Sequence, residues 1–318
     1  MTVGLLSLVR VSPERLAALS AAGYAVREAS KYPSRADALK DAGDSVRAVL
    51  TNGRGGISGA EMALLPKLEL VCTAGAGYEA VDLDTARSRG IAVSQCTDTN
   101  APAVADSAFM LLLASVRHLT EADRFVRTGG WQDQWRADTP TVCEKRLGIV
   151  GLGRIGNRIA RRAAGGFDME VGYHNRKPVA DSPYRYFDSA TGLAQWADFL
   201  IVAAPGGAGT RHLVNAEVLA ALGPKGHLVN VGRGTIVDTE ALIEALEAKR
   251  IGGAALDVVE GEPATPPILP KLLRFDNVTV TPHCAGRAPE SQTAATALIL
   301  ANLNAHFAGK PLVTPVKF

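Results

Sequence analysis

The sequence predicts an α/β fold in which two doubly wound parallel sheets form two domains. Short apolar runs alternate with helical stretches along all 318 residues, and this alternation is typical of doubly wound proteins. Several runs are continuously apolar, as expected of parallel strands that have helices on both faces. The length also favours about two domains, because a typical domain has ~150 residues.

The first third of the chain contains five apolar runs that predict strands, over residues 3–9, 24–29, 46–51, 68–73 and 91–96. A helix is expected over residues 12–22, because Ser12 is a favourable N-cap and Pro13 suits a first helical turn. A long helical stretch, expected over residues 101–127, follows the fifth strand.

A second series of strands begins only after this helical stretch. Strands are predicted over residues 147–150, 169–173, 199–203, 227–231, 254–258 and 278–281. A helix over residues 239–248 is expected to end at Lys249 and Arg250, before Gly252 and Gly253. A long helix, Pro289–Phe307, follows the last strand. A second domain is therefore placed at residues 98–287.

Composition excludes several classes of protein. The 34 Lys and Arg nearly balance the 32 Asp and Glu, whereas nucleic-acid-binding proteins usually carry a basic surplus. No apolar run reaches ~18 residues, and no basic region precedes the apolar N-terminus, so neither a membrane span nor a signal peptide is predicted. The four scattered cysteines predict free thiols, no metal site and a cytoplasmic location: Cys72, Cys96, Cys143 and Cys284.

A glycine-rich turn follows the predicted strand 147–150. Gly151, Gly153 and Gly156 have the G-x-G-x-x-G spacing between a strand and a helix, which is the context of a dinucleotide-binding turn. The glycines allow a tight bend, close approach to a pyrophosphate and close packing of helix on strand, while the helix N-terminus favours phosphates. The predicted cofactor site comprises Gly151, Leu152, Gly153, Arg154, Ile155 and Gly156.

A second motif, G-x-G-x-x-A over residues 75–80, also follows a strand, so the end of the next strand is used to choose between the two. An NAD site carries an acid there, about 20 residues on. The strand after residue 80 ends without a charge, whereas the strand after residue 156 ends in a basic turn: His174, Asn175, Arg176 and Lys177. Cations at this place pair with a 2′-phosphate, which predicts NADP(H) in preference to NAD(H). The alternative is an ordinary solvated turn. The 75–77 loop would then hold a small acidic substrate by its backbone N–H groups.

Three chemically active side chains follow strands of the second series. Arg233 lies between two glycines, Glu262 lies in the segment DVVEGEP and His283 in TPHCAG. Each also has an alternative without a function in catalysis: Arg233 could form a surface ion pair, Glu262 could be a solvated acid and His283 could be a buried structural histidine. The carboxyl ends of parallel strands share one edge, so all three can converge on a ligand there. A cation that polarises a ketone, a proton donor and a carboxylate that orients the imidazole suit the reduction of a 2-keto acid.

The chain resembles the D-isomer-specific 2-hydroxyacid dehydrogenase family. The matching segments are GLGRIG at 151–156, NVGRG at 230–234, DVVEGEP at 257–263 and TPHCAG at 281–286, and GAGYEAVDL at 75–83 and NAPAVADSA at 100–108 also look familial. The resemblance implies a Rossmann cofactor domain inserted into a flavodoxin-like substrate domain, which residues 1–97 and 288–318 would form together. It also implies an active site in the interdomain cleft.

Roles for individual residues follow from the same resemblance. It implies Arg233 as the residue that binds and polarises the substrate, and Glu262 with His283 as the acid–base pair. Backbone groups of Ala76 and Gly77 would bind the substrate carboxylate. Further cofactor contacts are expected at Pro205, Val231, Asp257 and Gly286.

Two features indicate which branch of the family the chain resembles. One is the basic turn, and the other is that no residues follow position 318 to form a regulatory domain. The chain is most similar to NADPH-dependent glyoxylate/hydroxypyruvate reductases and to hydroxyphenylpyruvate reductases. Reduction of glyoxylate or hydroxypyruvate is the first hypothesis, and an aryl pyruvate or 2-ketogluconate is the alternative substrate. Arg54, in a glycine-rich loop, either touches substrate or faces water. A dinucleotide-sensing corepressor is the hypothesis from another class.

Family members are usually homodimers, and in the glyoxylate and hydroxypyruvate reductases a Trp of one subunit can reach the other's site. Trp131 and Trp135 lie in the corresponding region. The resemblance therefore predicts a homodimer with Trp135 near the substrate. Ordinary interface packing is the alternative for both tryptophans.

Overall fold

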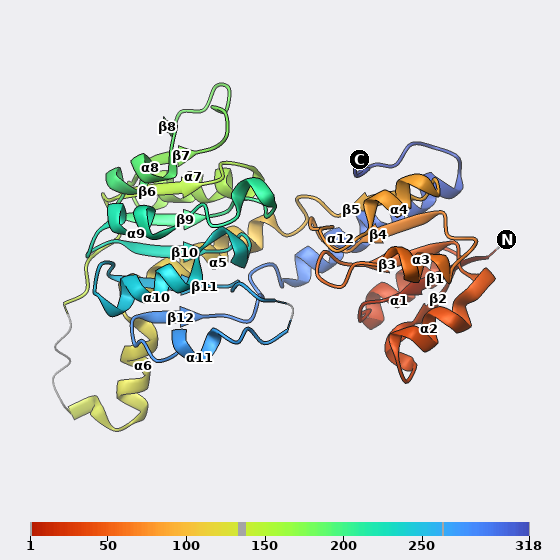
Figure 1. Cartoon of the computed structure of the whole chain (residues 1–318), viewed down its shortest axis with the longest axis horizontal. Helices are drawn as coiled ribbons and strands as arrows, with labels where there is room; N and C mark the ends of the chain where they lie inside the picture. Colours follow the sequence, from red (N-terminus) through yellow and green to blue (C-terminus); the bar gives the residue numbers. More distant parts are fainter. Residues whose placement is uncertain (1, 133–137, 263, 318) are drawn as a thin grey trace. The chain divides into compact units, whose positions relative to one another are not determined.

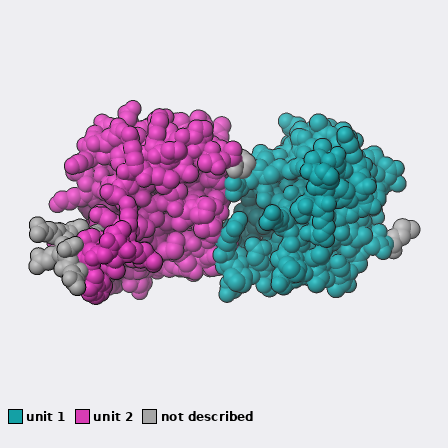
Figure 2. All heavy atoms as spheres, turned by 90° about the horizontal axis from the view of Figure 1, so that it is seen from below, with its two compact units in different colours: residues 1–100, 287–318 teal, residues 101–286 magenta. Residues whose placement is uncertain are grey.

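The computed structural model describes residues 2–132, 138–262 and 264–317. The chain divides into two compact units, which Figure 2 colours separately. Unit 1 comprises residues 1–100 and 287–318, and unit 2 comprises residues 101–286. The divisions therefore fall after residues 100 and 286, where the sequence analysis places them after 97 and 287.

Unit 1 is built on a five-stranded parallel sheet with the order β2-β1-β3-β4-β5. The chain reverses direction across the sheet between β1 and β3, as in flavodoxin-like folds. The strands are β1 Val3–Ser7, β2 Tyr24–Glu28, β3 Ala48–Thr51, β4 Leu70–Thr73 and β5 Ala92–Gln95. The helices are α1 Pro13–Ala21, α2 Arg35–Ala42, α3 Gly59–Ala63, α4 Leu83–Ser88 and α12 Pro289–Phe307 (Figure 1).

Both faces of this sheet are covered. One apolar cluster joins the strands to α2, α3 and α4, and a second joins them to α1 and α12. The C-terminal segment returns to this sheet, since Arg15 of α1 donates to Thr296 Oγ1 of α12 at 2.9 Å and Val316 N donates to Val93 O at 2.8 Å. Ser12 caps α1 as predicted, because its Oγ accepts from Arg15 N at 3.3 Å.

Unit 2 is built on a seven-stranded parallel sheet with the order β12-β11-β10-β9-β6-β7-β8. The order reverses between β6 and β9, which is the point where doubly wound sheets bind ligands. The strands are β6 Arg146–Val150, β7 Glu170–His174, β8 Arg185–Phe187, β9 Phe199–Val202, β10 His227–Asn230, β11 Gly253–Leu256 and β12 Val278–Val280. The helices are α5 Ala101–Val116, α6 Leu119–Arg127, α7 Arg154–Gly166, α8 Ala190–Trp196, α9 Ala216–Leu222, α10 Thr239–Glu247 and α11 Leu269–Leu272.

The core of unit 2 also has two layers. Helices α5 and α7 cover one face of the sheet, and α8, α9 and α10 cover the other. The central strands are fully buried, which explains why they are continuously apolar in the sequence. The prediction of two doubly wound parallel sheets is confirmed.

The structure differs from the predicted local structure in one helix and one strand. The helical stretch over residues 101–127 is two helices, because His118 adopts a left-handed conformation (φ 50°) and ends the continuity between α5 and α6. Strand β8 was not predicted, since Arg185–Phe187 has only three residues. The helix predicted over residues 239–248 is confirmed as α10, which ends at Glu247 with Ala248 as its C-cap.

Among the described residues, no single helix is long and apolar enough to cross a membrane. Helices α5 and α6 reach that length and composition only as a pair, and the pair is bent by 63°.

Candidate active site

The glycine-rich turn lies at the carboxyl end of β6, beside the point where the strand order of unit 2 reverses. Gly151 has φ 100°, and a Cβ at this position would lie 2.6 Å from Ala204 Cα, so both the backbone angle and the close approach require glycine. Gly151 N donates to His174 O at 3.0 Å, which ties the turn to the end of β7.

The start of α7 fits a dinucleotide pyrophosphate. The helix begins directly after Gly153 and has no side-chain cap, which leaves its first N–H groups for a phosphate. A Cβ at Gly153 would meet no atom of this chain within 4 Å, so packing within the protein does not explain the glycine. The space next to Gly153 and the uncapped N–H groups of α7 together suit a bound phosphate.

The basic turn after β7 divides into two parts. Arg176 and Lys177 are exposed, whereas the side chains of the two preceding residues are used within the fold. Asn175 Oδ1 accepts from Leu152 N at 2.7 Å, and His174 Nδ1 lies 2.9 Å from Phe187 O of β8. Asn175 therefore ties the basic turn to the glycine-rich turn, and the two cations next to it remain accessible.

Arg233 follows β10 in a turn that Asn230 shapes. Asn230 is fully buried; its Oδ1 accepts from Gly232 N and its Nδ2 donates to Arg233 O, each at 3.0 Å. The half-buried guanidinium donates from Nη1 to Gly232 O at 2.9 Å. A Cβ at Gly206 would lie 2.9 Å from Arg233 Cγ, so the stem of Arg233 packs on the segment after β9.

Glu262 and His283 form a hydrogen-bonded pair. His283 Nδ1 lies 2.6 Å from Glu262 Oε2, and the two side chains are 28% and 21% exposed. Glu262 Oε1 accepts from Val259 N at 2.9 Å, which orients the carboxylate toward the ring. Because Nδ1 faces the carboxylate, Nε2 is the ring nitrogen left to serve a reacting group.

The turn that carries His283 is held by a buried carboxylate. Asp257, 2% exposed, accepts from Thr281 Oγ1 at 2.6 Å, from Cys284 N at 2.9 Å and from Ala285 N at 3.0 Å. His283 N donates to Asp257 O at 2.8 Å, and His283 itself has φ 52°. These contacts position the imidazole. Asp257 therefore holds this turn, and its contact with the cofactor, which the resemblance implies, stays a prediction.

The three segments meet at one edge of the sheet. They follow β10, β11 and β12, which are neighbouring parallel strands. The turn at Gly234 lies directly against Val259, the residue whose N–H binds Glu262. The loop of Arg233 therefore contacts the loop that holds the Glu262–His283 pair.

The remaining predicted residues are spread over both units. In unit 2, Pro205 is exposed after β9, Val231 is buried and Gly286 is half-buried. In unit 1, Ala76 and Arg54 are exposed and Gly77 is half-buried. Trp131 is 80% exposed, and Trp135 lies outside the described residues.

Several supporting side chains were not predicted. Asn230 could have been predicted most readily, because it is a polar residue at the end of a buried strand, immediately before Val-Gly-Arg-Gly. Arg211 and His212 both contact Glu260, at 2.9 Å and 3.0 Å, and so hold the loop two residues before Glu262. Their distance in sequence from Glu260 left no local signal.

The cysteines do not supply an alternative nucleophile in unit 1. Burial raises the pKa of the Cys72 thiol to about 12 and that of Cys96 to about 11, so both are protonated at neutral pH. All four cysteines are free. Across the described ranges, no group of three or more His, Cys, Asp and Glu side chains is arranged to hold a metal ion.

Known proteins match most of the length of the chain. Hydroxyphenylpyruvate reductase of Plectranthus scutellarioides is 41% identical over 284 residues, which cover 89% of this chain and 90% of the relative. Glyoxylate/hydroxypyruvate reductase A of Arabidopsis thaliana has the same identity and coverage. A crystal structure of the NADPH-dependent glyoxylate/hydroxypyruvate reductase of Sinorhizobium meliloti, in complex with NADP and malonate, matches with a TM-score of 0.89 at 36% identity; the match covers 99% of this chain and 97% of that one.

The doubly wound sheets, the glycine-rich turn at the switch point and the carboxylate–imidazole pair define a dinucleotide-dependent oxidoreductase. A sequence model described as D-isomer specific 2-hydroxyacid dehydrogenase, NAD binding domain, matches residues 109–285. The chain belongs to this family. The predicted family and enzyme class are confirmed, and unit 2 contains the dinucleotide-binding domain.

Proposed function

We propose that the protein reduces a small 2-keto acid, glyoxylate or hydroxypyruvate, to the D-2-hydroxy acid with NADPH. The observation that carries the proposal is the 2.6 Å contact between His283 Nδ1 and Glu262 Oε2, beside the Arg233 turn and on the same sheet edge as the glycine-rich turn. The names of the relatives support the same substrate class.

Each of these side chains has a separate task. The guanidinium of Arg233 binds the substrate carboxylate and polarises the ketone oxygen. The protonated imidazole of His283 gives its Nε2 proton to the oxygen as the carbonyl is reduced, and Glu262 holds the ring and stabilises its positive charge. When bound, the reduced nicotinamide supplies the hydride. The product gains that hydride at carbon and the proton at oxygen.

Residues of unit 2 account for cofactor binding in this proposal. The N–H groups after Gly153 and the backbone of residues 151–156 hold the pyrophosphate, with further contacts from Pro205, Val231 and Gly286. Arg176 and Lys177 pair with the 2′-phosphate, which favours NADP(H) over NAD(H). Their exposure next to Asn175, whose side chain binds Leu152 N, supports this assignment.

The substrate carboxylate also needs hydrogen-bond donors from backbone. Ala76 and Gly77 follow β4 in a glycine-rich loop, and among the described residues neither N–H group donates a hydrogen bond. We assign these two groups to the carboxylate. A larger keto acid, such as hydroxyphenylpyruvate or 2-ketogluconate, is the alternative substrate, and the hydroxyphenylpyruvate reductase relative favours the former.

We propose a cytoplasmic homodimer, with part of α5, α6 and residues 128–132 at the interface. Large apolar side chains are exposed on these elements, as expected of a surface that a partner covers: Met110 of α5, Leu119 and Val126 of α6, and Trp131. The free cysteines agree with a reducing compartment.

The test is steady-state turnover of a panel of 2-keto acids, each with NADPH and with NADH. Glyoxylate, hydroxypyruvate, hydroxyphenylpyruvate and 2-ketogluconate form the panel. The proposal expects the highest kcat/KM for glyoxylate or hydroxypyruvate with NADPH. Dinucleotide binding without turnover of any keto acid would refute it and favour a dinucleotide sensor.

A further inference from the structure

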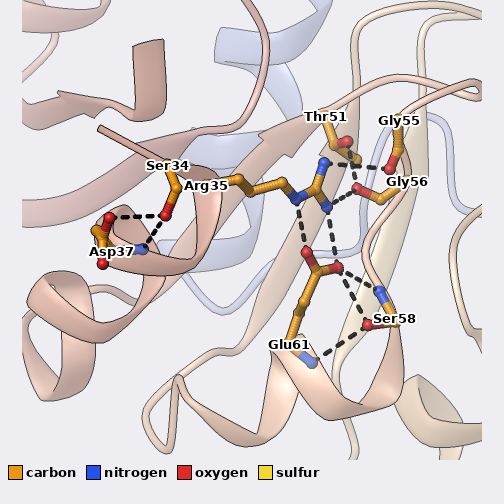
Figure 3. Close-up of polar contacts among 8 residues, drawn as sticks. All are labelled: Ser34, Arg35, Asp37, Thr51, Gly55, Gly56, Ser58 and Glu61. Carbon is orange, nitrogen blue, oxygen red and sulfur yellow. Dashed lines mark hydrogen bonds and ion pairs between the residues drawn. The ribbon is translucent and has the colours of Figure 1, made fainter. Parts of the chain in front are cut away.

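One ion pair organises the loop that follows β3, residues 52–56. Arg35 begins α2, and its guanidinium forms a fork with Glu61 of α3: Nε–Oε1 is 2.6 Å and Nη2–Oε2 is 3.0 Å. The same guanidinium donates to two loop carbonyls, Gly55 O at 3.2 Å and Gly56 O at 2.8 Å (Figure 3). One side chain therefore links two helices to this loop.

The carboxylate of this pair is fixed in place. Glu61 Oε2 also accepts from Ser58 N at 2.8 Å and from Ser58 Oγ at 3.1 Å, within the capping box of α3. Burial by itself would raise the pKa of Glu61, but the hydrogen bonds from Arg35 and Ser58 outweigh it, so the pKa lies below its usual value. The Glu61 carboxylate is therefore ionised at neutral pH.

The loop is ordered from the inside as well. Thr51 Oγ1 donates to Gly56 O at 2.7 Å, and Asn52 Oδ1 accepts from Gly55 N at 2.7 Å. The guanidinium and the Thr51 hydroxyl thus share the Gly56 carbonyl. Without Arg35, the Gly55 carbonyl loses its donor and the Glu61 carboxylate loses its cation.

This loop in turn supports the 75–80 segment. Ala80 N donates to Gly53 O at 3.3 Å, and Ile57 N donates to Ala80 O at 3.2 Å. A Cβ at Gly53 would lie 2.6 Å from the Gly77 carbonyl carbon, so the two backbones are in direct contact. The position of Gly77 therefore depends on the conformation of residues 52–56.

The other end of the 75–77 loop is anchored independently. The Gly75 carbonyl accepts from Cys96 N at 2.9 Å and from Thr73 Oγ1 at 3.0 Å. The contacts described above join the neighbouring loop to the Gly77 end. A movement of residues 52–56 would change the direction of the Gly77 N–H while leaving the strand beneath it intact.

We propose that Arg35 is a positioning residue for substrate: through Gly55, Gly56 and Gly53, it sets the N–H groups that receive the keto acid's carboxylate. This inference rests on the proposed function, which assigns Ala76 and Gly77 to that carboxylate. Arg35 touches neither substrate nor cofactor in this role. Its effect is confined to substrate affinity, because the dinucleotide site belongs to unit 2.

The experiment compares Arg35→Lys and Arg35→Gln with a matched control, Arg47→Gln. Arg47 forms the same kind of fork in unit 1, with Glu69 at 2.6 Å and 2.9 Å, and among the described residues none of its hydrogen bonds or ion pairs involves residues 52–56. The lysine variant keeps the charge opposite Glu61, but one ammonium cannot span a carboxylate and two carbonyls. General destabilisation would therefore appear in the control, and loss of the fork geometry would appear in both Arg35 variants.

The readouts are KM for glyoxylate, kcat, the Ki of oxamate (the amide analogue of a 2-keto acid), the Kd of NADPH and Tm. Both Arg35 variants should raise KM and Ki by about ten-fold or more, because a small displacement of a binding group has a large effect. Values of kcat and the NADPH Kd should stay within about two-fold of wild type. Arg47→Gln should leave KM and Ki unchanged.

The outcomes separate the two proposals. An active wild type with an unchanged oxamate Ki in Arg35→Lys would overturn this inference alone. A wild type that neither turns over any keto acid nor binds oxamate overturns the proposed function and this inference with it. Equal increases in KM for Arg47→Gln and Arg35→Gln would assign the effect to stability and also refute the positioning role.

Discussion

Acidification from pH 7 to pH 4 is expected to weaken unit 2 through one buried histidine. His227 begins β10 and is 4% exposed. Its Nδ1 lies 2.9 Å from Ser115 Oγ of α5, and its ring packs edge-on against Phe199 with 6.1 Å between centroids. Burial lowers the pKa of His227 to about 4, and the nearby His118 adds to the effect.

The sign follows from proton uptake by the two states. In the unfolded chain His227 titrates near its ordinary pKa of 6.5, whereas in the folded protein it stays neutral until about pH 4. Between these values the unfolded state binds more protons, so the free energy of unfolding decreases as the pH falls. The full contribution is present above pH 6.5 and is lost by pH 4.

The magnitude follows from the same two values. One pKa unit corresponds to about 1.36 kcal/mol, and the shift from 6.5 to about 4 gives a loss of about 3 kcal/mol. That loss is a large fraction of the stability of an ordinary domain, about 5–15 kcal/mol. Acid unfolding of unit 2 should therefore begin before its surface carboxylates are fully protonated.

The assay is urea unfolding at several pH values between 8 and 4.5, for wild type and His227→Gln. Tryptophan fluorescence reports unit 2, because all three tryptophans lie within residues 101–286 and Trp196 packs against Phe187 in its core. The variant lacks the titrating ring but keeps a polar group near Ser115. Subtracting the free energy of unfolding of one protein from that of the other, at each pH, cancels the contributions of all other groups that titrate in both.

Wild type should lose about 3 kcal/mol more than His227→Gln between pH 7 and pH 4. Within the measured range, the free energy of unfolding of wild type should fall more steeply with pH than that of the variant. The difference in slope should be near 1.4 kcal/mol per pH unit between pH 6 and 5. If the free energy of unfolding changes with pH equally in the two proteins, His227 has the same pKa in the folded and unfolded states. The argument from burial would then be wrong.

Other predictions concern the site. Replacing Arg176 and Lys177 together by Gln should raise the KM for NADPH by about 10–100-fold and leave that for NADH nearly unchanged, since each cation would lose a charge-assisted bond; equal losses for both cofactors would contradict the 2′-phosphate assignment. His283→Ala should lower kcat by at least about 100-fold while the Kd of NADPH is kept, and unchanged turnover would place the proton donor elsewhere. Asp257→Asn should cost about 1–3 kcal/mol, because an amide cannot accept all three hydrogen bonds; an unchanged Tm with full activity would contradict this role.

Much of the secondary structure was determined by local sequence. Strands such as Phe199–Val202 are buried on both faces, so their sequences are continuously apolar and can be recognised without knowledge of their neighbours. The glycine-rich turn was equally clear, because Gly151 is required by its own backbone angle. Position 118 shows the limit of such patterns, since a left-handed histidine breaks a stretch whose sequence predicts one helix.

The tertiary structure decided what the polar side chains do. The spacing of Glu262 and His283 allowed a pair, but only the parallel arrangement of β11 and β12 brought Nδ1 to 2.6 Å from the carboxylate. Asn175 was predicted as part of the cofactor site, and the structure adds that its side chain accepts a hydrogen bond from Leu152 N. Arg35 gave no signal at all, because its partners lie 20 to 26 residues away. Apolar periodicity records burial, which each strand or helix experiences locally, whereas hydrogen-bond partners depend on which elements the fold places side by side.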